Sequence, residues 1–173
     1  NGPTDYRLER LSGVDIYHMP NGEEATAKLR EAFFRLTDHS VDDAQSVPSE
    51  TLDVYGRELF VPKSLKGVAV FSFKRLCMNP LGAADYLAIA RHYHTVILVG
   101  VPKMTKAQRN EAKRFVTLID ALYEHRVKTL IAADAPPQAL YPAGDGAFEF
   151  ERTISRLMEM QSQEYLALGH GGL

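Results

Sequence analysis

The sequence predicts an α/β protein with a parallel sheet and flanking helices, together with a small N-terminal helix and a β-hairpin region. The runs 67–73, 94–102 and 128–134 are short and apolar, as buried strands are. Amphipathic helical patterns separate them, and the order strand, helix, strand requires parallel pairing through right-handed crossovers. The run TVILVGV is continuously apolar, which is typical of a strand buried on both faces.

The first 50 residues predict a helix followed by a linker. The segment NGEEATAKLREAFFRL begins with two acidic residues, which the helix dipole favours in a first turn. Its apolar residues recur at helical spacing: Ala25, Leu29, Ala32, Phe33 and Leu36. Residues 38–50 are acidic, small and interrupted by proline, which indicates a loop. We therefore expect two parts: 1–50, a helical segment and linker, and 51–173, the α/β domain with the hairpin and the C-terminal helix.

Residues 51–62 predict a two-stranded hairpin with one solvated face. Leu52, Val54, Leu59 and Val61 alternate with polar residues about a turn at Gly56.

Helix signals follow each predicted strand. In NPLGAADYLAIARHY we expect Asn79 as the N-cap and Pro80 at the first helical position. Thr105 and Gln108 form a capping-box pattern for the next helix, which carries Phe115. The last helix is expected over 148–168. Six residues at helical spacing lie along one stripe of it, and all but Gln161 are largely apolar: Phe150, Ile154, Leu157, Gln161, Tyr165 and Leu168.

Composition narrows the classes of partner. Hydrophobic residues make up 45% and charged residues 24%, with a net charge of -2, which describes a globular protein and gives no basic surface for nucleic acid. The single cysteine, Cys77, excludes an internal disulfide and a thiolate zinc site, and suits the cytoplasm. The longest apolar run is far shorter than the roughly 20 residues of a membrane-spanning helix. Membrane contact is therefore expected to be peripheral at most.

Asp134 follows the predicted strand 128–134, and ligands of parallel sheets bind beyond the carboxyl ends of strands. An acid there can orient a water or contact a magnesium ion bound to phosphate, which makes Asp134 a candidate nucleotide sensor. The alternative is that Asp134 caps the short helix that Pro136 and Pro137 begin.

Arg152 and Arg156 lie four residues apart on the last helix, so they project from the same side. Paired guanidinium groups can stabilise charge in phosphoryl transfer as arginine fingers. The alternative is a solvated face in which Arg156 pairs with Glu159 and Arg152 with Glu149.

Other chemistry has little support in the sequence. His92 and His94 are two residues apart and have no third ligand nearby, so no metal site is predicted, and a role as cations at a helix C-terminus is favoured. Cys77 is interpreted as a small buried hydrophobe rather than a nucleophile.

The phosphate-binding motif G-x-x-x-x-G-K-[ST] is absent from all 173 residues. The strand TVILVGVP also ends in Gly-Val-Pro, where a magnesium-binding acid is needed. The chain alone is therefore not expected to hydrolyse ATP.

Three long segments nevertheless resemble a known family. They are NPLGAADYLAIARHYHTVILVGVP, KRFVTLIDALYEHRVKTLIAADAPPQALY and FEFERTISRLMEMQSQEYL, and the opening TDYRLERL is similar as well. Together they resemble the ZapE cell-division ATPases, whose mitochondrial relatives include the lactation-elevated ATPase. The resemblance implies an AAA-like P-loop ATPase that uses ATP and Mg²⁺, with its phosphate-binding loop upstream of Asn1. It implies that this chain is the carboxyl half, an associated subdomain that binds no cofactor by itself.

The resemblance also implies partners and sites. The partners are the N-terminal ATPase half, further copies of the protein and a division-ring protein, in the cytoplasm and peripheral to the inner membrane. Arg7 follows the expected lid and could reach nucleotide as a sensor, and Arg152 and Arg156 fall in the matching segment FERTISRL. Lys74 and Arg75 stand where many relatives carry an acidic pair, which argues against a magnesium site at that strand end.

Two hypotheses of different classes remain open. In the first, the chain is the subdomain of a nucleotide machine and supplies arginines to ATP bound elsewhere. In the second, it is a protein-interaction or assembly module without nucleotide contact, because its strands and helices repeat the order of a P-loop half without the catalytic acids. An independent enzyme built on Asp134 lacks an accompanying base, nucleophile or metal set.

Overall fold

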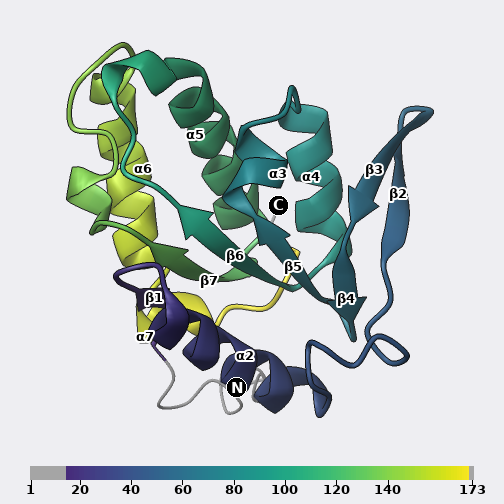
Figure 1. Cartoon of the computed structure of the whole chain (residues 1–173). Helices are drawn as coiled ribbons and strands as arrows, with labels where there is room; N and C mark the ends of the chain where they lie inside the picture. Colours follow the sequence, from purple (N-terminus) through teal and green to yellow (C-terminus); the bar gives the residue numbers. More distant parts are fainter. Residues whose placement is uncertain (1–14, 172–173) are drawn as a thin grey trace.

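A computed structural model describes residues 15–171 and contains a five-stranded sheet (Figure 1). The strand order is β1 (Tyr17–His18), β7 (Lys128–Ala133), β6 (Thr95–Val101), β5 (Val68–Ser72) and β4 (Lys63–Leu65). Every pairing is parallel except that of β4, which runs antiparallel to β5 at the edge. The predicted class, α/β with a mainly parallel sheet, is confirmed.

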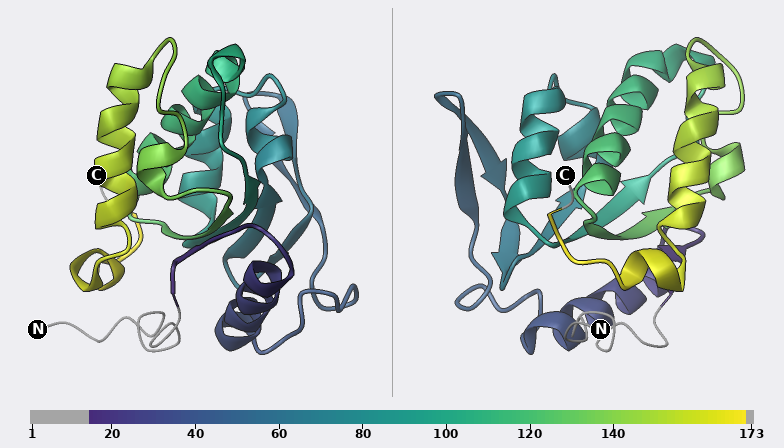
Figure 2. Two further views of the ribbon diagram at one scale, coloured as in Figure 1. Left: turned by 60° about the vertical axis from the view of Figure 1, so that its left-hand side comes forward. Right: turned by 180° about the vertical axis from the view of Figure 1, so that it is seen from behind.

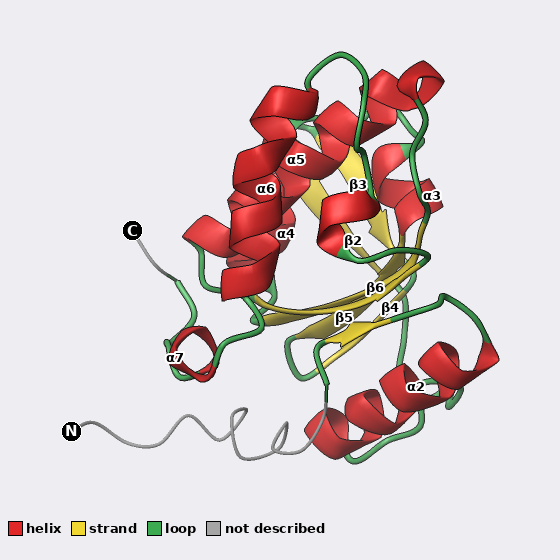
Figure 3. Ribbon diagram, turned by 90° about the vertical axis from the view of Figure 1, so that its left-hand side faces the viewer, coloured by secondary structure: helices red, strands yellow, loops and turns green. Residues whose placement is uncertain are grey.

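Helices cover both faces of the sheet, which explains why β7 is buried at every position and β6 at most positions. One face is covered by α3 (Phe73–Cys77), α4 (Ala83–His92), α5 (Arg109–Glu124) and α6 (Ala147–Glu159). On the opposite face lies α2 (Glu23–Thr37) (Figures 2 and 3). Short 3-10 turns, η1 (Lys106–Gln108) and η2 (Pro137–Ala139), follow β6 and β7.

The three central strands pair through β6, the middle one. Ile97 of β6 lies between Val70 of β5 and Leu130 of β7. Above the sheet, the Phe115 ring of α5 packs against Phe73 and Phe150, with ring centroids 6.0 and 6.1 Å away. These rings join α3, α5 and α6 into one layer.

The predicted hairpin forms a separate two-stranded sheet, β2 (Glu50–Val54) and β3 (Arg57–Val61). Tyr55 and Gly56 make its turn with φ of 54° and 84°, which matches the two-residue turn that fits twisted strands. The alternate residues Leu52, Val54, Leu59 and Val61 are buried, as predicted. The hairpin packs beside α4 and β5 (Figure 1).

The predicted start of α4 is wrong. The helix begins at Ala83 rather than Pro80, because the Asp85 carboxylate accepts a hydrogen bond from the Gly82 N–H at 2.8 Å and caps it there. The Asn79 side chain instead donates to the carbonyls of Lys74 and Arg75 at the end of α3.

The predicted single helix over 148–168 is also wrong. It divides into α6, which ends at Glu159, and α7 (Gln163–Leu166). The Ser162 hydroxyl accepts a hydrogen bond from the Tyr165 N–H at 3.1 Å, and such a side-chain bond starts a new helix at the expense of the old one.

Residues 38–49 form a loop without helix or strand, as expected. The division at residue 50 stays a prediction, and α2 contacts both β5 and β7. Within residues 15–171, no helix combines the length and apolar character needed to cross a bilayer.

Candidate functional site

The carboxyl ends of β5, β6 and β7 bring three loops to one edge of the sheet. Asp134 directly follows β7, and its N–H donates to the Val101 carbonyl of β6 at 2.9 Å. Its carboxylate is exposed and has no hydrogen-bond or ion-pair partner within residues 15–171. The alternative cap role is wrong, because η2 begins at Pro137, its N-cap residue is Pro136, and no side chain caps it. Asp134 is therefore available to a ligand or partner.

The loop after β5 turns directly into α3. The Ser72 hydroxyl accepts from the Arg75 N–H at 3.1 Å and caps this short helix. The Arg75 guanidinium lies over the Phe60 ring of β3, 5.0 Å from its centroid. Arg75 therefore contacts the hairpin from this strand end.

The loop after β6 borders a pocket of about 350 Å³. Its lining is largely apolar, with lysines at two positions: Lys103, Met104, Thr105, Lys106, Ala139, Pro142 and Ala143. The Met104 N–H donates to the Leu140 carbonyl at 2.7 Å and joins this loop to the end of η2. A second acid beside Asp134 is missing from the residues directly after the three strands, and no group of three potential metal-binding side chains occurs within residues 15–171. These residues do not fit a magnesium–triphosphate site by themselves.

Arg156 is a bridge between α6 and α5. Its guanidinium contacts the carboxylates of Asp120 and Glu124 and lies over the Tyr123 ring, 4.7 Å from the centroid. The side chain is 19% exposed. The predicted partner Glu159 instead accepts a hydrogen bond from the Tyr123 hydroxyl at 2.9 Å. This geometry is that of a packing contact.

Arg152 differs from Arg156 although both lie on one helical stripe. Its side chain is 67% exposed, and it contacts Asp120 at 3.5 Å rather than the predicted partner Glu149. An arginine held this loosely can reach another surface. No hydrogen bond or ion pair joins Asp134 to either arginine within the described residues, and Arg7 lies outside them.

The two histidines of RHYHTV contact different elements. His92 ends α4 and lies 3.8 Å from the Glu50 carboxylate of β2. His94 follows the helix, and its Nε2 lies 2.8 Å from the Lys66 carbonyl. Cys77 is buried, and burial raises the pKa of its thiol well above the ordinary value. A neutral buried thiol suits the predicted structural role.

Glu50 and Asp85 are two polar positions that sequence reasoning missed. The Glu50 carboxylate accepts hydrogen bonds from the hydroxyls of Tyr93 at 2.5 Å and Ser64 at 2.7 Å. These two bonds lower the pKa of Glu50 despite the opposing effect of burial. The Asp85 carboxylate accepts from Arg57 of the hairpin at 2.7 Å. A capping-box search started at Gly82 finds Asp85 three residues later, whereas no local pattern reveals the contacts of Glu50.

Comparisons with known proteins identify relatives along nearly the whole chain. A family model described as AFG1-like ATPase matches residues 1–168. The cell division protein ZapE of Escherichia coli K12 is 35% identical over 166 residues, which cover 96% of this chain and 43% of that protein. Lactation elevated protein 1 homolog B of zebrafish (Danio rerio) is 33% identical over 198 residues, covering 95% and 39%.

An uncharacterised protein of Schizosaccharomyces pombe is 30% identical over 194 residues, covering 96% of this chain and 42% of the relative. The chain thus spans about two fifths of the length of the curated relatives it matches. No solved structure matches it. Since the family model spans almost all of the sequence, the chain belongs to the AFG1-like ATPase family.

Proposed function

We propose that this chain is an associated α/β subdomain of an ATP-hydrolysing protein. The phosphate-binding loop and the magnesium ligands would come from sequence outside these 173 residues. The observation that supports this most directly is the match of the ATPase family model over residues 1–168. The matching chain nevertheless spans only 43% of its ZapE relative and contains no phosphate-binding loop motif. ATP and Mg²⁺ are then cofactors of the whole protein.

Within this proposal, Arg152 is the arginine that approaches nucleotide held elsewhere. Its exposed guanidinium has one loose contact, whereas the guanidinium of Arg156 is occupied by two carboxylates and an aromatic ring. Freeing Arg156 would break the α5–α6 contact, so we assign it a positioning role. A guanidinium beside a transferring phosphoryl group stabilises the negative charge that develops there, which is the role proposed for Arg152. Arg7 and Asp134 remain proposed nucleotide sensors.

The test is ATP turnover by the natural full-length protein with Arg152→Ala. We expect kcat to fall by at least about tenfold with little change in KM, since a finger acts in the transition state. Ser155→Ala is the matched control, because Ser155 is an exposed neighbour on the same helix. Unchanged kcat in Arg152→Ala would remove the finger role, and a wild-type protein without magnesium-dependent ATP hydrolysis would remove the ATPase proposal itself.

The cellular setting is part of the same proposal. ZapE of E. coli is named a cell division protein, and we propose a role in cell division for the protein that contains this chain. The proposed partners are its ATPase portion, further copies of itself and a division-ring protein. It would act in the cytoplasm, peripheral to the inner membrane. Fractionation of cells at low and high salt tests this, because peripheral binding is released by salt and an integral protein stays in the membrane fraction.

A further inference from the structure

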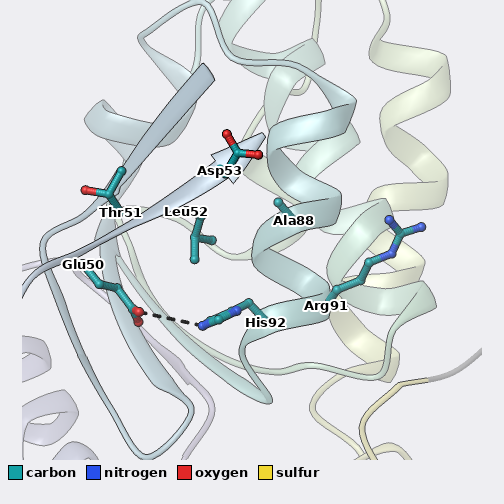
Figure 4. A pocket seen from close by; sticks show the side chains of 7 residues that line it. All are labelled: Glu50, Thr51, Leu52, Asp53, Ala88, Arg91 and His92. Carbon is teal, nitrogen blue, oxygen red and sulfur yellow. Dashed lines mark ion pairs between the residues drawn. The ribbon is translucent and has the colours of Figure 1, made fainter. Parts of the chain in front are cut away.

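A groove separates the outer strand of the hairpin from helix α4 (Figure 4). Its volume is about 440 Å³. One wall consists of four consecutive β2 residues, Glu50, Thr51, Leu52 and Asp53, and the other of Ala88, Arg91 and His92 on one side of α4. A strand edge facing a helix across a groove is the geometry in which proteins bind an extended peptide as an added strand.

The register of the hairpin shows that the β2 edge is open. Val54 and Arg57 flank the two-residue turn and form a hydrogen-bonded pair, so by alternation Leu52 and Glu50 also bond to β3. The backbone N–H and C=O groups of Thr51 and Asp53 consequently point away from β3. Within residues 15–171 no backbone group accepts or donates to them, and β2 pairs with no second strand. Two donors and two acceptors are left for an incoming strand.

The groove is held in shape before anything binds. At the hairpin turn, Arg57 donates to the buried Asp85 of α4. At the start of β2, Glu50 accepts from Tyr93, the residue that follows α4. Because both ends of the hairpin are fixed to α4, a peptide enters a preformed site and does not have to order it.

The acidic side chains that line the groove, Glu50 and Asp53, both belong to β2, whereas Arg91 and His92 belong to α4. Figure 4 shows the His92 ring pointing toward Glu50 and the Arg91 side chain pointing away from β2. Glu50 is already satisfied by two hydroxyl groups and lies near His92. Asp53 is exposed and has no ion-pair partner within the described part of the chain. An occupant with a basic side chain opposite Asp53 complements this surface.

These charges disfavour a second copy of the chain as the occupant. Strand β2 carries Glu50 and Asp53 and no basic residue. A second β2 edge would bring no basic side chain to pair with Asp53, and it would add the negative charges of the two strands. Charged residues on an edge strand are a known protection against self-association.

We propose that this groove binds an extended, basic segment of a partner protein as a strand antiparallel to β2, with a lysine or arginine side chain paired with Asp53. The backbone groups of Thr51 and Asp53 supply the affinity, and Leu52 forms the apolar floor. The ATPase proposal is independent of this site.

The test selects displayed random peptides on the immobilised full-length protein, with Thr51→Pro protein as the counter-selection. Proline removes the outward N–H of Thr51, and the β2–β3 ladder does not use that N–H. Thr51→Ala is the matched control because it keeps the N–H. We expect peptides with a basic residue among alternating β-branched residues to be enriched, and a synthesised consensus to bind Thr51→Pro about tenfold more weakly.

Asp53→Lys is a second variant, at an exposed position, and keeps the test decisive if proline perturbs the hairpin. It should weaken the consensus peptide by a similar factor, whereas Thr51→Ala should change binding by less than about twofold. The proposal is overturned if no basic peptides are enriched, or if the enriched peptides bind both variants as well as wild type. A dimer in sedimentation that Thr51→Pro dissociates would assign the edge to a second copy instead.

Discussion

Replacing Asp85 tests how the hairpin and α4 are joined. Its side chain is 1% exposed and accepts two hydrogen bonds, from the Gly82 N–H at 2.8 Å and from Arg57 at 2.7 Å. Asp85→Ala removes both acceptors. The Gly82 N–H then turns to water and the first turn of α4 loses its cap.

The expected loss follows from these contacts. A missing capping side chain costs about 1–2 kcal/mol. Arg57 is 53% exposed and is hydrated after the loss, so its contact adds little. For a domain of this length, about 1.5 kcal/mol corresponds to a Tm lower by roughly 3–6 °C.

Thermal unfolding followed by circular dichroism measures this shift. Asp85→Asn is the matched control, since its amide oxygen can still accept from Gly82 and only the charge is lost. We expect it to lower Tm by less than half as much. Two results would refute the reasoning: an Asp85→Ala protein within about 1 °C of wild type, or an Asp85→Asn protein as damaged as Asp85→Ala.

Three further variants test other contacts. Hydrogen bonds lower the pKa of Glu50 in the folded protein, so the stabilisation by this carboxylate is present above the unfolded pKa of about 4.3 and is lost as pH falls through the folded pKa. The unfolding free energies of wild type and Glu50→Gln, measured by urea titration, should therefore converge toward acid pH. Arg156→Ala should lower stability by about 1–2 kcal/mol in the same assay, and an equal loss in Arg152→Ala would contradict their different burial. Gly67→Ala should lower Tm more than Gly56→Ala does. Both glycines have positive φ, but only at Gly67 would an added Cβ lie 2.5 Å from a histidine ring. Equal Tm values for the two variants would show that this ring moves away at little cost.

Local pattern was sufficient for the central sheet. The runs that became β5, β6 and β7 are apolar on both faces, and the helices between them leave one way to pair. Strand β1 was missed because Tyr17–His18 is too short to have a period and exists through its pairing with β7. The start of α4 was wrong because Asn79-Pro80 is a good start signal by itself, and the sequence gives no sign that α3 takes the Asn79 side chain.

The candidate site was less predictable, because the surroundings of each side chain depend on how distant elements pack in the tertiary structure. Arg152 and Arg156 occupy one stripe in sequence, yet the position of α5 places carboxylates and a ring around Arg156 and leaves Arg152 exposed. The peptide groove was invisible for the same reason. Alternation in residues 51–62 predicts a hairpin and its buried face, but not which helix lies opposite its edge.

The contact between Arg57 of the hairpin and Asp85 of α4 also fixes one end of the groove, which gives a last prediction. Asp85 does not line the groove, but Asp85→Ala frees the turn end of the hairpin from α4. A mobile hairpin must be ordered when a peptide binds, and that ordering reduces affinity without removing a peptide contact. Asp85→Ala should therefore weaken binding of the basic consensus peptide by about threefold to tenfold. Isothermal titration calorimetry should show that the binding entropy has become less favourable. Unchanged affinity in a destabilised Asp85→Ala protein would mean that Glu50 and the buried face of β2 hold the groove open without this contact.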